Sequence, residues 1–412
     1  MGGQPPIYRR RAVSDNYGMT NTTNKLRPTV LLAFDALGDY WLRVARGAAD
    51  VLRDIDVDVH LTHQLPPNRL VNDNQEIKGV IARVASVESM RALQGLRVPI
   101  VNVGNARDEI ALPRVGVDDR AVGVMLCDHL AACGVRVMAY AGDSTRFARE
   151  RGAGFVARAK ELGATVVGCR VEHKPGTNYG RVLQEWIQAA APHPLGLACV
   201  NDGRADAMIN HALLAGLKPG QNPLVIGVDN ELVVQLRCRV PLSSVDVPGD
   251  AIGRTAAEML LTLMKGEPPA APVIIPPVRV VARRSTQPVK VADPAIQRAQ
   301  LYMAEHATSG VSVDDVVTAS RVSRRTLESR FRTHLNSSIH DQLQALRLAR
   351  ARDLLSDTTL PLAEVSRLSG FGGVGHFIKS FKLAAGLTPG QFRVIARGHG
   401  EPDAVENEAE SE

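Results

Sequence analysis

The stretch SVDDVVTASRVSRRTLESRF, residues 312–331, predicts two short helices joined by a tight turn. Ser312 and Asp315 form a capping box, because each side chain can accept a backbone N–H of the first helical turn. A second helix is expected to begin after Ser323, and Leu327 and Phe331 then recur on one of its faces. Two such helices around a tight turn predict a helix-turn-helix unit.

The second helix of this unit has a polar face that can read DNA. Opposite its apolar side chains lie four polar ones, Arg325, Glu328, Ser329 and Arg332. In a major groove, Arg can donate to both acceptors of guanine and Glu can accept from the amino group of cytosine. A solvated surface helix has the same composition, so this face alone does not decide between the two interpretations.

The same architecture recurs about fifty residues later, which favours DNA contact. A short helix over 362–368 precedes a helix anchored by Phe377 and Phe381, and this second helix exposes His376 and Lys379. Two reading helices in succession fit successive major grooves, whose centres are roughly 10 bp apart. The sequence therefore predicts an all-α domain with two helix-turn-helix units and double-stranded promoter DNA as its partner.

A long helix from about 339 to 355 is expected to hold the two units at a fixed spacing. Its inward face is predicted to carry Leu343, Leu346 and Leu354.

The charge distribution supports a polyanionic partner. Of the formal net charge of +6, residues 294–397 contribute an excess of bases, with 14 Arg and Lys against 8 Asp and Glu. The end of the chain, 401–412, holds six acidic residues and no base, and residues 1–27 hold five bases and one acid. The basic surplus therefore lies where the reading helices are predicted.

Upstream of residue 293 the sequence alternates short β-branched runs with segments of helical period, which predicts doubly wound parallel sheets. Helices are expected over 40–53, 119–133, 148–162, 178–191 and 203–215. Strands are expected over 29–34, 57–62, 79–84, 99–104, 137–142, 165–171, 195–201 and 224–229. Eight strands exceed one sheet of usual size, so we expect two similar lobes that follow one another along the chain.

Polar residues at strand ends predict a ligand cleft, because ligands of such folds lie at the carboxyl ends of the strands. They are Asp119, Asn201, Asp202 and Asp229, each in a pair of neighbouring polar residues. Carboxylates and amides suit sugar hydroxyls, although Asp and Asn are also favoured helix N-caps. Trp41 follows the first strand, where it can cover an apolar sugar face or pack in the core.

Both halves of the chain resemble known families. The run Gly370-Phe371, Phe377, Phe381-Lys382, Gly386, Thr388-Pro389, Phe392-Arg393 resembles the C-terminal signature of the arabinose-regulator (AraC/XylS) family of transcription factors. This resemblance implies that Arg325, Glu328 and Ser329 read bases in the first unit, and His376 and Lys379 in the second. Gly373 stands where the family usually has a Ser cap, so we expect the second unit to contact mainly phosphates.

The first half is similar to the lactose/galactose-repressor family and to periplasmic sugar-binding proteins, on the runs RGAGF (151–155), Asn201-Asp202 and GVDN (227–230). The resemblance implies a two-lobed, periplasmic-binding-protein-like sensor in which Arg151 contacts a sugar. The combination of the two domains in this order is similar to that of pentose-responsive regulators. It implies D-xylose as effector, a homodimer, and RNA polymerase as a partner if the protein is an activator. A different sugar, a purine or another metabolite remains the alternative effector.

These predictions divide the chain into an N-terminal tail (1–27), a sensor (28–286), a linker (287–293), a DNA-binding domain (294–397) and an acidic tail (398–412). Scattered cysteines and histidines predict no structural metal and no disulfide framework. No Walker loop, dinucleotide fingerprint or nucleophile elbow is present, so we expect no enzyme activity and no cofactor. We expect a cytoplasmic protein, because the N-terminus lacks the apolar core of a signal peptide.

Overall fold

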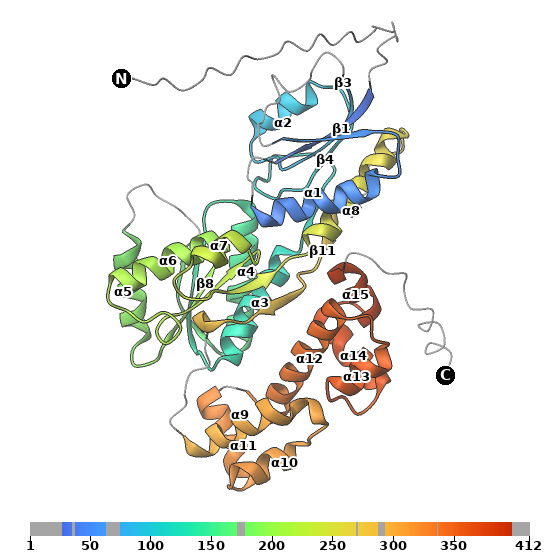
Figure 1. The fold of residues 1–412 in the computed structure, drawn as a ribbon. Coiled ribbons are helices and arrows are strands. Elements are labelled where there is room, and N and C mark those ends of the chain that lie inside the picture. The colour runs from blue at the N-terminus through green and yellow to red at the C-terminus, as the bar shows by residue number, and fades with distance from the viewer. Residues whose placement is uncertain are drawn as a thin grey trace, which may run out of the picture.

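The computed structural model describes residues 27–34, 38–62, 75–170, 178–268, 271–286, 293–335 and 337–397. Two α/β lobes are followed by a helical domain that packs beneath the second lobe (Figure 1). The predicted N-terminal tail, linker and acidic tail lie almost entirely outside the described residues. Among the described helices, none combines the length and the apolarity that a bilayer span requires.

The first lobe is a four-stranded parallel sheet in the order β2-β1-β3-β4. Its strands are β1 (Arg27–Ala33), β2 (Asp58–Thr62), β3 (Gln75–Ala82) and β4 (Ile100–Asn102). Its helices are α1 (Asp39–Leu52), α2 (Val87–Gln94) and α8 (Gly249–Met264). The predicted strands of this lobe are confirmed, and apolar residues of β1, β3 and β4 are buried on both faces of the sheet, whereas Val59 and Leu61 of the edge strand β2 are exposed.

The second lobe is a six-stranded sheet in the order β12-β10-β9-β8-β6-β7, in which only β12 is antiparallel to its neighbour. Its strands are β6 (Val137–Ala141), β7 (Thr165–Arg170), β8 (Leu195–Cys199), β9 (Leu224–Val228), β10 (Ser243–Asp246) and β12 (Arg279–Val281). Its helices are α3 (Asp119–Ala132), α4 (Arg146–Glu161), α5 (Tyr179–Ala190), α6 (Asp202–Leu214) and α7 (Leu232–Arg237).

The two lobes are interleaved along the chain, so the expectation that one follows the other is wrong. Helix α8 comes after strands β6 to β10 of the second lobe in sequence but packs on α1 of the first lobe. The approach is close because Gly47 and Gly253 have no side chain. A Cβ added to Gly253 would lie 1.9 Å from the carbonyl oxygen of Val44, and one added to Gly47 would lie 2.0 Å from that of Asp250.

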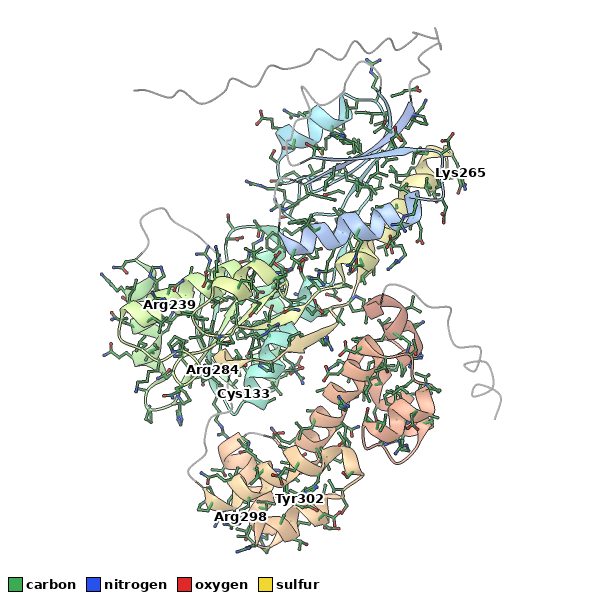
Figure 2. The ribbon with its side chains drawn as sticks, viewed as in Figure 1. Cys133, Arg239, Lys265, Arg284, Arg298 and Tyr302 are labelled. Atoms are coloured by element: carbon green, nitrogen blue, oxygen red, sulfur yellow. The ribbon has the colours of Figure 1, made fainter. Side chains whose placement is uncertain are left out.

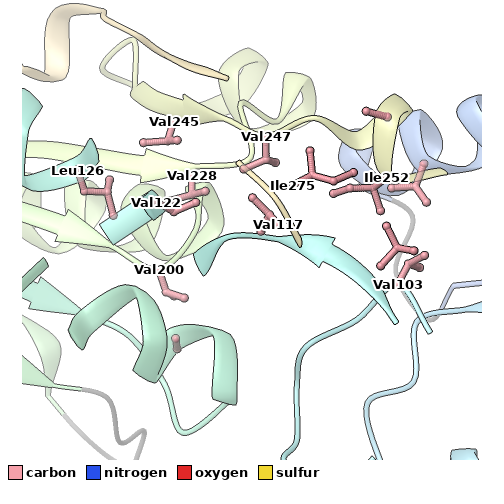
Figure 3. Packing of buried hydrophobic residues seen from close by; sticks show 14 of the residues in the cluster. Val103, Val117, Val122, Leu126, Val200, Val228, Val245, Val247, Ile252 and Ile275 are labelled. Carbon is pink, nitrogen blue, oxygen red and sulfur yellow. The ribbon is translucent and has the colours of Figure 1, made fainter. Parts of the chain in front are cut away.

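A two-stranded parallel ribbon joins the lobes, formed by β5 (Val115–Val117) and β11 (Val273–Ile275). Val117 and Ile275 of this ribbon belong to one buried cluster with Val228 of the second lobe and Ile252 of the first (Figure 3). The buried core is therefore continuous from one lobe to the other across this ribbon.

The helical domain contains α9 (Pro294–His306), α10 (Val313–Ser320), α11 (Arg324–Leu335), α12 (Ile339–Asp357), α13 (Leu362–Leu368), α14 (Val374–Ala385) and α15 (Pro389–Arg397). Helix α12 belongs to both of its cores, with Leu343 in the first cluster and Leu348 and Leu354 in the second. The prediction for Leu346 is wrong, because its side chain is 38% exposed and Leu348 lies inward instead. The buried side chains of α12 therefore lie on different faces in the two halves of the helix, and a single inward face does not describe them.

Candidate functional site

A cavity of about 390 Å³ lies between the two lobes. This volume is within the range of about 300–1,000 Å³ that is usual for small-molecule sites. The residues that line it come from the start of α1, the end of β4, the ribbon strand β5 and the strand ends of the second lobe. Five of the six predicted ligand residues are among them, namely Trp41, Asp119, Arg151, Asn201 and Asp229.

Arg151 and Asp119 form a buried ion pair at the floor of the cavity. The guanidinium donates to Asp119 Oδ1 at 2.8 Å and to the carbonyl oxygen of Val200 at 2.5 Å. Both residues are at most 6% exposed. Burial raises the pKa of Asp119 although Arg151 counteracts this rise. A buried, rigid pair of this kind presents fixed donors and acceptors to a polar ligand.

Asp229 follows β9 at the carboxyl edge of the second sheet, and its carboxylate lines the cavity. Burial raises its pKa to about 6, with a further rise from Glu231 and an opposing effect of Arg151. Its backbone has a φ of 99°, a conformation that is uncommon for residues other than glycine. Its carbonyl oxygen accepts from Arg43 at 2.9 Å, which holds the strained peptide in place. Such strain is characteristic of ligand sites.

Asn105 lines the cavity and was missed by the sequence analysis. Its side-chain nitrogen donates to Asp119 at 2.8 Å and to Glu150 at 3.0 Å. Its buried Oδ1 has no hydrogen-bond partner in the described part of the chain. A buried acceptor without a partner is costly, so it is suited to a ligand hydroxyl. Asn105 lies just after β4, and the same rule of polar residues at strand ends could have found it.

The aromatic wall of the cavity is formed by Trp41 and Phe147. Trp41 stacks on buried Phe34, with ring centroids 5.5 Å apart, and the Arg83 guanidinium lies 5.5 Å from the Trp41 ring centroid. The Arg151 guanidinium lies 5.2 Å from the Phe147 ring centroid. Trp41 therefore both packs against the core and borders the cavity, so the two interpretations of this residue are compatible.

Asp202 does not line the cavity. It is fully buried, and its carboxylate accepts from the Ser244 hydroxyl at 2.7 Å and from the backbone N–H of Glu231 at 2.9 Å. Its contacts order the loop after β9. Its neighbour Asn201 caps α6 by accepting from the backbone of Arg204 at 2.8 Å, and also lines the cavity.

The first helix-turn-helix unit has the geometry that its sequence predicts. Ser312 and Asp315 form the capping box of α10, and the turn passes through Arg321 at a φ of 60°. Leu327 and Phe331 of α11 are buried in the first core of the domain. Of its predicted base-reading face, Arg325, Ser329 and Arg332 are exposed, while Glu328 is half-buried and accepts from Arg324 at 3.0 Å.

The second unit exposes His376 and Lys379 on α14, while Phe377 and Phe381 are buried. The helix starts at Gly373 without a side-chain cap, as the missing Ser predicts. A Cβ added at Gly375 would meet nothing within 4 Å, so this position leaves an open notch in the exposed face. Fewer side chains are thus available for base contacts here than on α11.

The second lobe contacts the helical domain through β12 and the residue before it. Val278 belongs to the same buried cluster as Leu348 and Phe377. Arg279 donates to Asp353 and to Asp357 of α12, each at 3.1 Å. A further bond runs from Arg136, which precedes β6, to the backbone oxygen of Arg332 on α11 at 2.8 Å. The segment 271–286 therefore supplies one strand of the inter-lobe ribbon and also contacts α12, the central helix of the helical domain.

The chain leaves the sensor from a fixed point in the second lobe. The turn η1 (Arg284–Thr286) is held by Ser285, whose hydroxyl donates to Val225 at 2.6 Å, and by Thr286, which contacts His129 at 2.7 Å. Burial lowers the pKa of His129 to about 4. Cys133 and Arg284 lie at the end of this lobe that faces helix α9, which carries Arg298 and Tyr302 (Figure 2).

Two family models match this chain. A periplasmic binding protein-like domain covers residues 127–286, and a helix-turn-helix domain covers residues 316–394. These matches confirm the predicted fold class, a two-lobed α/β sensor followed by an all-α domain with helix-turn-helix units.

The chain is also similar to named proteins over most of its length. It is 33% identical to the xylose operon regulatory protein of Escherichia coli (strain K12) over 329 residues, which are 77% of this chain and 84% of the relative. It is 27% identical to the protein of the same name from Haemophilus influenzae, over 89% of this chain and 98% of the relative. A solved structure of a xylose-binding transcription activator has 30% identity and a TM-score of 0.54, covering 89% of this chain and 98% of that chain.

Proposed function

Because the chain belongs to the family of xylose operon regulatory proteins and is a sugar-responsive, DNA-binding transcription regulator, we propose that its effector is D-xylose and that it activates genes of pentose catabolism. The relatives are regulators and not enzymes, and we propose that this chain likewise catalyses no reaction. Its place of action would be the cytoplasm, where promoter DNA is found.

The observation that carries the proposal is the set of polar groups in the inter-lobe cavity. The Arg151–Asp119 pair supplies fixed donors and acceptors, and the carboxylate of Asp229 and the unpaired Oδ1 of Asn105 can each accept from a hydroxyl. A pentose has hydroxyl groups on both faces of its ring and an apolar face that suits the Trp41 side of the cavity. These polar groups around a small cavity therefore fit a monosaccharide better than an apolar metabolite.

We propose that sugar binding closes the lobes and that closure reaches the DNA-binding domain through segment 271–286. This segment forms one strand of the ribbon between the lobes and also contacts α12, so a movement of the ribbon would act on the helix that holds both reading units. The sugar can shift this equilibrium only through its preference for the closed form. Two subunits in a homodimer would present four reading helices to the promoter and contact RNA polymerase during activation.

The test measures promoter binding by fluorescence anisotropy and sugar binding by calorimetry on the full chain. We expect D-xylose to bind and to change the affinity for promoter DNA, or its bending, at fixed salt. Equal DNA affinity and equal bending with and without bound D-xylose would contradict the coupling. A panel of other pentoses, hexoses and purines run in parallel decides the effector, because binding of one of these in place of D-xylose would favour the alternative regulator.

A further inference from the structure

The carboxylate of Glu231 crosses from the second lobe to the first and caps helix α1. It accepts from the backbone N–H of Asp39 at 2.6 Å and from that of Tyr40 at 3.2 Å. These N–H groups belong to the first turn of α1 and have no partner within their own helix. Glu231 precedes α7, yet its side chain makes no capping bond to α7. The carboxylate is therefore committed to the opposite lobe.

In the part of the first lobe that the structure describes, no side chain substitutes for this cap. The N-cap position of α1 is Gly38, which has no side chain to accept a hydrogen bond. The same glycine makes room for the incoming group, because a Cβ added to Gly38 would lie 2.5 Å from Glu231 Oε1. Gly38 has a φ of −74°, so alanine can adopt this backbone conformation. Its Cβ would affect only the space that the Glu231 carboxylate occupies.

A second inter-lobe contact lies next to the first. Arg43, one turn further along α1, donates to Asp246 at 3.0 Å and to the carbonyl oxygen of Asp229 at 2.9 Å. The backbone N–H of Glu231 is itself held by Asp202, whose other oxygen bonds to Ser244 of β10. Glu231 thus stands on a loop that the second lobe positions firmly, at the edge of the sugar cavity that it lines.

We propose that Glu231 is a positioning residue that holds the two lobes in the closed arrangement and thereby sets the affinity for sugar. A carboxylate at a helix N-terminus is stabilised in two ways. Its negative charge strengthens the hydrogen bonds that it accepts, and it interacts favourably with the helix dipole. Opening the lobes breaks both bonds and leaves the first turn of α1 to water. The closed form is then populated even without sugar, and sugar affinity rises with the fraction of closed molecules. The effect on sugar binding rests on the function proposed above, whereas the effect on closure does not.

Single-molecule fluorescence transfer on the ligand-free full chain tests the closure directly. Fluorophores are attached through unnatural amino acids at Glu88 on α2 and Gln184 on α5, two exposed positions in different lobes. Glu231→Ala is expected to shift the distribution of transfer efficiency towards the open arrangement. Glu231→Gln, which keeps an acceptor oxygen without the charge, is expected to give an intermediate shift. By calorimetry, Glu231→Ala should weaken D-xylose binding by about tenfold, equivalent to about 1.4 kcal/mol.

Two further variants separate a bridge between lobes from a local loss of stability. Ser86→Ala removes the side-chain cap of α2, which lies wholly within the first lobe, and is expected to leave the distribution unchanged. Gly38→Ala displaces the carboxylate from the other side and should open the lobes even if Glu231→Ala does not fold. An unchanged distribution in Gly38→Ala and Glu231→Gln, or an equal shift in Ser86→Ala, would overturn the proposal. If the wild-type chain does not bind D-xylose, the effector assignment fails, and the ligand-free distributions still decide the role of Glu231.

Discussion

Replacing Asp229 by Asn is expected to stabilise the ligand-free protein and to weaken sugar binding. The carboxylate lies in the inter-lobe cavity, where burial raises its pKa from an ordinary 3.8 to about 6. The folded state therefore binds this proton more tightly than the unfolded state between these two values, and stability falls as the pH rises through that window. Asn has the same shape without the charge, and it tolerates the positive φ of this position better than most residues.

The size of the effect follows from the pKa. With 1.36 kcal/mol for each tenfold change, the charged form costs about 3 kcal/mol of folding free energy at pH 7 and about half of that at pH 5. For a unit of this size, about 2–4 °C per kcal/mol gives a rise in Tm of about 6 °C or more. We expect the lower part of this range, since water reaches the cavity. Differential scanning calorimetry at pH 7 and pH 5, with and without D-xylose, measures both the rise and the loss of ligand stabilisation.

Asp108→Asn is the matched control, because it removes a carboxylate that is 60% exposed and bonded to surface arginines. Its Tm should change little, as is usual for exposed ion pairs. The reasoning is refuted if Asp229→Asn melts at or below the wild-type Tm at pH 7. It is equally refuted if the gain in Tm is as large at pH 5 as at pH 7.

Four other substitutions test the remaining parts of the molecule. Arg279→Ala removes the ion pairs to Asp353 and Asp357 and should weaken domain docking by about 1 kcal/mol; the D-xylose-dependent change in promoter affinity, measured by anisotropy, is then expected to shrink. Arg325→Ala should cost about 1–3 kcal/mol on the promoter site and little on a scrambled duplex, whereas Lys379→Ala should weaken both and lower the salt dependence by about one ion. His129 has a pKa lowered to about 4, so it binds its proton less tightly in the folded state than in the unfolded one, and the stability it confers is lost as the pH falls from 6.5 towards 4. Urea unfolding should therefore show a smaller loss on acidification for His129→Gln than for the wild type, by about 3 kcal/mol if the full window is crossed.

Most of the fold could be predicted from the sequence because buried parallel strands are continuous apolar runs. The strands that escaped prediction, β10, β11 and β12, have three or four residues each, and they carry serines or lie near prolines. Their positions are determined by their partners in the sheets, which local pattern does not encode. Local pattern does not encode the return of α8 to the first lobe either, since the contact of Gly253 with Val44 joins distant parts of the chain.

The cavity was predicted in part because polar residues at strand ends converge whenever the strands are parallel. The rule does not tell which member of a pair faces the ligand. It does not distinguish Asn201, which lines the cavity, from its neighbour Asp202, whose carboxylate is hydrogen-bonded inside the second lobe. It also offers no sign of Glu231, because the partner of this carboxylate is the backbone of a helix 191–192 residues away.

Helix α12 has a further consequence for how promoters recognised by this protein can change. Since its side chains enter both cores of the DNA-binding domain, one added residue would turn the second reading unit by about 100° and move it by about 1.5 Å relative to the first. Helix α12 thus fixes the spacing between the two helix-turn-helix units. One base pair inserted into the operator would likewise rotate one of its two contacted segments away from the unit that binds it. Operators of this regulator are therefore expected to diverge through base substitutions, while the number of base pairs between the two contacted segments stays constant.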